Sequence, residues 1–126
     1  MNERDFDFGS RPLQGIAPDL LEFLKAKVNT FIKWDLVRFF HENPHTTDIA
    51  DNIARYAWRA PAEIAAELAQ MANDGILSAH MLGSLPVYTL TEDAPTRDLI
   101  ARFVLACEDR DFRVKAIYYT IRSPKH

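Results

Sequence analysis

The side chains that could do metal or redox chemistry are few and stand apart. His41 and His45 lie four residues apart, a spacing that lets two imidazoles on one helix face bind zinc. However, Asn43-Pro44 ends a helix between them. We therefore interpret both as surface histidines. Cys107, the single cysteine, lies on an apolar stripe and is expected to be a small buried hydrophobe. The sequence predicts no metal site.

Motifs of enzymatic catalysis are also missing. The chain has no Gly-rich phosphate loop, no serine elbow and no paired-histidine zinc helix. Trp34 and Trp58 fall near predicted helix junctions, where aromatic side chains are more often core than part of a cofactor site. We expect no enzyme activity and no cofactor.

Length and composition indicate one globular domain. The 126 residues are 48% hydrophobic and 26% charged, which excludes wholesale disorder. No apolar run is long enough to span a membrane, so no membrane association is expected. A single cysteine fits a reducing, cytoplasmic environment. Residues 1–17 look like a flexible arm, and residues 18–126 like a single domain.

The charge is unevenly distributed along the chain. Residues 1–59 carry 8 basic and 9 acidic side chains, residues 60–96 carry none and 5, and residues 97–126 carry 7 and 4. The three blocks therefore have net charges of −1, −5 and +3. A general basic footprint for nucleic acid is absent, and the middle block is the most acidic part.

Apolar periodicity and helix signals define the elements that position these residues. Helical spacing predicts helices over 18–28 and 30–42, the second capped by Thr30. Thr46 or Thr47 is expected to cap a helix that ends near Trp58, and Pro61 to begin another that ends at Gly75. Strand formers at 76–82 and 87–91, joined by "GSLP", predict a β-hairpin. A further helix begins near 94. Residues 111–122 read as helix or strand, and we favour helix.

This order of elements resembles a known domain. The segments that carry the resemblance are "WDLVRFFHENP", "TTDIADNIARYA", "PAEIAAELAQMANDGIL" and "PVYTLTEDA". Residues 30–91 resemble the winged helix-turn-helix domains of the MarR and ArsR regulator families. The expected fold is mainly α within the α+β class, with flanking N- and C-terminal helices. The helix-turn-helix would span 46–74, the two-stranded wing 75–91, and a dimerising helical segment 94–122.

The resemblance implies a homodimeric transcriptional regulator whose third helices enter successive major grooves of double-stranded DNA. Gln70 and Asn73 are then candidates to read adenine edges, unless they are simply solvated polar residues. The candidate phosphate contacts, each with the alternative of an ordinary surface charge or helix cap, are Arg55, Arg59, Thr46 and Thr47.

The predicted third helix conflicts with that role. It carries Glu63, Glu67 and Asp74 and no basic residue, so it repels phosphates unless other cations reach the same face. The lysines that would have to supply them are Lys25, Lys27 and Lys33.

A protein-interaction module that does not bind DNA is the alternative function. The predicted wing tip holds Met81, Leu82 and Leu85, where polar turn residues are usual. Either these side chains meet a partner protein, or the two leucines fold back onto the domain core. The candidates for a contact between subunits are Phe103, Phe112, Tyr118 and Tyr119.

Overall fold

The computed structural model describes residues 16–122, which are mainly helical with a small antiparallel sheet. The helices are α1 (Pro18–Lys27), α2 (Phe31–Glu42), α3 (Ala50–Tyr56), α4 (Pro61–Asn73), α5 (Ala94–Ala106) and α6 (Arg110–Arg122). The strands are β1 (Thr47–Ile49), β2 (Leu77–Leu82) and β3 (Leu85–Leu90). The α+β class and the helical character of residues 111–122 are confirmed. The predicted arm falls mostly outside the described residues, but its Ile16 is buried in the core.

Helix boundaries follow from local hydrogen bonding. The Thr30 hydroxyl oxygen accepts the N–H of Lys33 at 3.1 Å and caps α2, as predicted. Asp93 caps α5 in the same way by accepting the N–H of Thr96 at 3.1 Å. Pro61 lies in the first turn of α4, where its missing N–H leaves no helical bond unmade.

The expected cap on α3 is wrong. Thr47 begins strand β1 instead, and α3 starts at Ala50 without a side-chain cap. The reason is non-local: β1 pairs with β3, and the Thr47 hydroxyl bonds to that of Thr89 at 3.2 Å. The sheet therefore has three strands in the order β1-β3-β2, not the two that were predicted.

Two glycines determine the hairpin. Gly75 ends α4 with a φ of 85°, as predicted, and the chain turns directly into β2. At the other end Gly83 has a φ of 64° in a two-residue turn, the position where a type II′ hairpin turn needs glycine. Because this turn is so tight, β3 begins at Leu85, two residues earlier than predicted.

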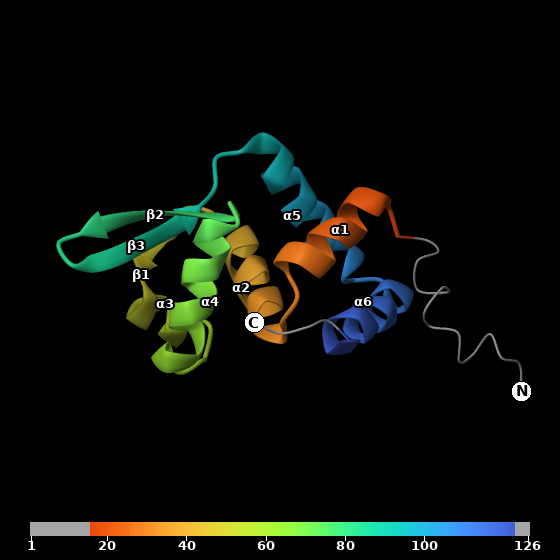
Figure 1. Ribbon diagram of the computed structural model, residues 1–126, viewed down its shortest axis with the longest axis horizontal. Coiled ribbons are helices and arrows are strands. Elements are labelled where there is room, and N and C mark those ends of the chain that lie inside the picture. Colours follow the sequence, from red (N-terminus) through yellow and green to blue (C-terminus); the bar gives the residue numbers. More distant parts are fainter. Residues whose placement is uncertain (1–15, 123–126) are drawn as a thin grey trace, which may run out of the picture.

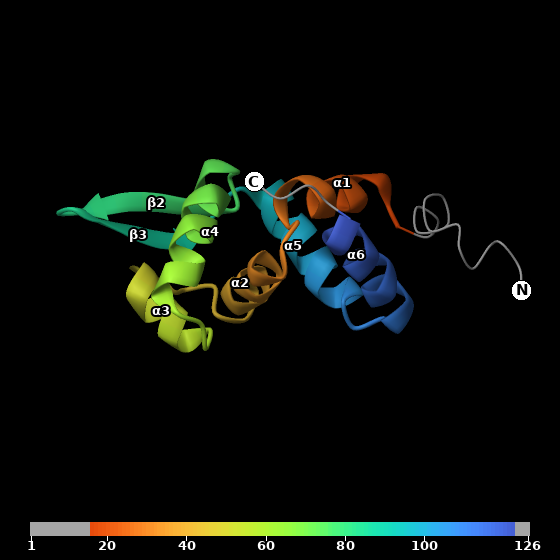
Figure 2. The same ribbon diagram turned by 60° about the horizontal axis from the view of Figure 1, so that its bottom comes forward.

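Helix α2 packs against two groups of elements. One group is α3, α4 and the sheet, and the other is α1, α5 and α6; α2 contacts α4 and β3 on one side and α5 on the other. Figure 1 shows the β2–β3 hairpin projecting at one end of the molecule and α1, α5 and α6 gathered at the opposite end. The turned view in Figure 2 shows the same division.

An aromatic cluster joins the C-terminal helices to α2. The Phe103 ring meets Phe23, Trp34 and Phe112 edge to face, with centroids 5.7–6.5 Å apart. Phe103 and Phe112 are buried within a single chain, so the expectation that they lie between subunits is wrong. The apolar stripe on α5 therefore packs against other elements of the same domain. No helix among residues 16–122 is long and apolar enough to cross a membrane.

Candidate interaction surface

The outward face of α4 is made mostly of alanine. Its exposed residues beyond Pro61 are Ala62, Glu63, Ala65, Ala66, Ala69 and Asn73. Asn73 therefore points to solvent, which both the base-reading and the solvated-polar interpretations predict. Gln70 and Glu67, which were expected on this face, turn instead toward α2 and are half-buried.

The side chain of Lys33 on α2 explains why Glu67 and Gln70 point toward that helix. Lys33 as a residue is 1% exposed, and its Nζ donates to Gln70 Oε1 at 2.6 Å and to Asn29 Oδ1 at 3.0 Å. Glu67 Oε1 lies 3.7 Å from the same nitrogen. A buried ammonium is costly unless it is paired and hydrogen-bonded, so α4 must supply both an acid and an amide here. Lys33 is accordingly unavailable to a phosphate, and Gln70 is engaged within the chain.

Glu63 has a structural role of its own. Its Oε1 accepts the N–H of Ala60 at 3.2 Å, and its charge lies at the positive end of the α4 dipole. Two of the three acids that conflict with groove entry are thus explained by folding. Their charge nevertheless stays on or near the helix surface.

The candidate phosphate contacts are dispersed. Arg59 pairs with Asp35 of α2, and this hydrogen bond raises the pKa of Arg59. Arg55 is exposed and donates to Asn52. Thr47 is held in the sheet, as described above. Of the two arginines predicted to contact phosphates, Arg55 is therefore the one open to a polyanion, because Arg59 is held in its ion pair with Asp35.

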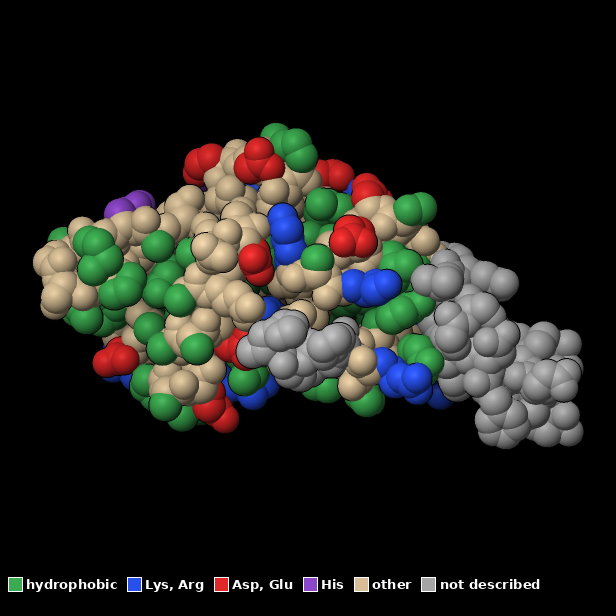
Figure 3. Space-filling model, in the orientation of Figure 1, with side chains coloured by type: hydrophobic (Ala, Val, Ile, Leu, Met, Phe, Trp, Pro, Cys, Tyr) green, Lys and Arg blue, Asp and Glu red, His purple; other side chains and the backbone are tan. Residues whose placement is uncertain are grey.

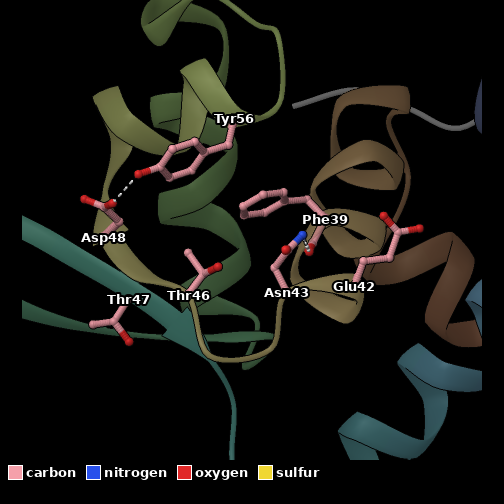
Figure 4. A pocket seen from close by; sticks show the side chains of 7 residues that line it. All are labelled: Phe39, Glu42, Asn43, Thr46, Thr47, Asp48 and Tyr56. Atoms are coloured by element: carbon pink, nitrogen blue, oxygen red, sulfur yellow. Dashed lines mark hydrogen bonds between the residues drawn. The ribbon is translucent and has the colours of Figure 1, made fainter.

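Thr46 and Thr47 line an open hollow of about 640 Å³ between the end of α2 and α3 (Figure 4). The Phe39 and Tyr56 rings face each other across it, with centroids 6.0 Å apart and planes 18° from parallel. Its other lining residues are Glu42, Asn43 and Asp48. A phosphate entering beside the two threonines would meet two carboxylates and no Lys or Arg from the lining.

Asp48, one of the residues that line this hollow, is held as a carboxylate. It accepts hydrogen bonds from the Asn52 amide at 2.7 Å, the Ile49 N–H at 2.8 Å and the Tyr56 hydroxyl at 3.1 Å. Burial by itself raises the pKa of Asp48, but these hydrogen bonds outweigh it and hold the pKa below its usual value. The negative charge beside Thr47 is therefore stable at neutral pH.

Trp58, expected in the core, is the most exposed large apolar residue described, at 93%. It lies in the α3–α4 turn with a φ of 58°, in the position that glycine favours after a helix. The Arg59 N–H bonds to the Ala54 carbonyl at 2.9 Å, which closes the turn around it. A bulky side chain in this conformation is strained, and this one gains no packing in return.

The wing tip is open to solvent. Met81, Leu82 and Leu85 are 63%, 69% and 50% exposed, so the alternative that the leucines fold back onto the core is wrong. Figure 3 shows hydrophobic side chains gathered at the hairpin end of this face.

Tyr118 and Tyr119 of α6 are half-buried, and each ring lies near a cation of the same chain. Lys25 Nζ lies 5.7 Å from the Tyr119 centroid, and the Arg122 guanidinium 5.3 Å from that of Tyr118. The large apolar residues that α5 and α6 expose are instead Leu105, Val114, Ile117 and Ile121. The periodicity of 94–122 did not separate these from the buried set, because apolar residues occupy more than one face. Cys107 is buried, as expected, and burial raises its pKa.

Compared with models of known protein families, with curated proteins and with solved structures, the chain gives no match.

Replacement of Lys33 by Met should lower the free energy of unfolding by about 2–3 kcal/mol, because it strands Glu67 and Gln70. Arg38→Met, which removes an exposed charge from the same helix, should change it by less than about 0.5 kcal/mol. Adding Glu67→Leu and Gln70→Leu to Lys33→Met should recover most of the loss. Urea unfolding followed by circular dichroism measures all three. Equal effects of the two single substitutions would contradict the tethering role of Lys33.

Replacement of Trp58 by Gly should stabilise the chain by about 1 kcal/mol, since it relieves the left-handed strain and removes no packing. Trp58→Ala keeps a Cβ in the same conformation and should leave stability within about 0.5 kcal/mol of wild type. Thermal and urea unfolding compare the three proteins. A destabilised Trp58→Gly variant would show that the ring is packed in solution.

Proposed function

We propose that residues 30–91 form a winged helix-turn-helix and that the chain acts as a protein-interaction module rather than a DNA-binding regulator. The order α2, β1, α3, α4 and the β2–β3 hairpin supports the fold assignment. In this assignment α3 and α4 are the helix-turn-helix, and β2 with β3 is the wing.

The charge of α4 and the wing carries the functional part of the proposal. No Lys or Arg occurs between Ala60 and Thr96, which includes all of α4 and the hairpin. Phosphate neutralisation by Lys and Arg supplies nearly all non-specific affinity for DNA. Within the described helix-turn-helix, Arg59 is paired with Asp35, so Arg55, in two copies per dimer, is the arginine left to make such contacts. Glu63 would approach the same phosphates. The balance of charges opposes groove entry.

The exposed apolar residues support a protein partner. Trp58 and the tip residues Met81, Leu82 and Leu85 are large side chains that the domain leaves in water. Tryptophan is among the residues that contribute most to protein interfaces, and an exposed apolar patch usually marks one. Because the wing is uncharged, it can be buried against another protein without desolvating a charge.

We expect no detectable binding to random duplex DNA at low salt, measured by fluorescence anisotropy of a labelled duplex. Too few cations face the DNA to release several counterions. The control is a variant with Ala62→Lys and Ala66→Lys on the exposed face of α4, which should acquire salt-sensitive binding. Wild-type binding whose affinity falls with a log–log salt slope of several units would favour the regulator.

The double variant Leu82→Ser with Leu85→Ser should unfold within about 0.5 kcal/mol of wild type and should bind less of a dye that reports exposed apolar surface. Leu77 and Leu90 form a matched pair at the buried base of the same hairpin. Converting that pair to Ser should cost several kcal/mol. If the tip variant loses comparable stability, the tip is core and not an interface.

A further inference from the structure

Strand β2 has a free edge. In the order β1-β3-β2, β1 and β2 pair with the two sides of β3, and among the described residues no strand pairs with the outer side of β2. All of Ser78–Leu82 is exposed, so neither face of this stretch is covered. Figure 1 shows the strand along the margin of the molecule.

Within residues 16–122, this edge lacks the features by which proteins keep strand edges apart. Edge strands are usually protected by charges, proline, a bulge or a covering segment. No Asp, Glu, Lys or Arg occurs from Gly75 to Thr91, and Pro86 lies on β3, not on β2. The register runs without interruption from Leu77↔Leu90 to Leu82↔Leu85, so there is no bulge.

The backbone groups available at the edge follow from the hairpin. Leu82 and Leu85 flank a two-residue turn and therefore form a hydrogen-bonded pair, and the pairs then alternate along the ladder. Ala79 and Met81 belong to the other set. Their N–H and C=O groups point away from β3 and need a partner.

We propose that β2 pairs with β2 of a second copy of this chain, antiparallel and about a two-fold axis, to form a continuous six-stranded sheet. This rests on the proposed function and names the partner of the same wing. Each copy presents the outward N–H and C=O groups of Ala79 and Met81 to the same groups of the other copy. Two identical strands can therefore form hydrogen bonds with each other in this arrangement. The chain has a net charge of −3, whereas the segment from Gly75 to Thr91 contains no Asp, Glu, Lys or Arg, so pairing through the wing brings no like charges of these residues together. The contact also covers Met81 and Leu82.

Sedimentation velocity over a range of concentrations tests this pairing on the full chain. The wild type should dimerise. Met81→Lys places two ammonium groups at the paired edge and should weaken the dimer at least tenfold. Ala79→Pro removes an outward N–H and should have the same effect, while circular dichroism stays that of the wild type. Ile121→Lys, a matched exposed apolar site on α6, should leave the dimer unchanged.

Hydrogen exchange supplies an independent readout. The amides of Ala79 and Met81 should exchange more slowly at high than at low protein concentration, and that of Gly83 in the turn should not change. A chain that is monomeric at every concentration overturns the pairing. So does a dimer that Ile121→Lys disrupts and Met81→Lys does not. A monomer that also fails to bind DNA overturns only the pairing and leaves the proposed function standing.

Discussion

The ammonium group of Lys33 lies inside the protein between α2 and α4, held by Asn29, Gln70 and Glu67. A charge at 1% exposure cannot remain there without these partners, so the contact between the two helices depends on α4 supplying an acid and an amide at fixed positions. This requirement also determines which side chains α4 exposes on the surface. Glu67 and Gln70 of α4 point toward Lys33, and the exposed face of the helix is mostly alanine.

The same helix α2 also meets the second group of elements. Its Trp34 ring packs on Phe103 of α5, while Lys33, one residue earlier, reaches α4. A helix with apolar contacts on one side and a polar tether on the other holds the two groups in one orientation. The wing is thereby fixed relative to the C-terminal helices, which a flexible linker would not achieve.

Two features are costly for an isolated chain. Trp58 occupies a backbone conformation suited to glycine, and the edge of β2 is uncharged and open. Neither contributes to the packing of the domain. Features of this kind are expected where a surface is used for contact, because residues kept for binding are not free to be optimised for stability or solubility.

The local elements were determined by the sequence itself. Helical spacing, the cap at Thr30, the restart at Pro61 and the glycine at 75 act over a few residues. For this reason α2, α4 and the presence of the hairpin were predicted correctly, although β3 begins at Leu85, two residues earlier than predicted. Strand β1 was missed because three residues carry no periodic signal, and it forms only when β3 is alongside. The roles of Lys33, Gln70, Phe103 and Phe112 were misjudged for the same reason. Their burial depends on which helix packs opposite, and only the tertiary structure brings those helices together.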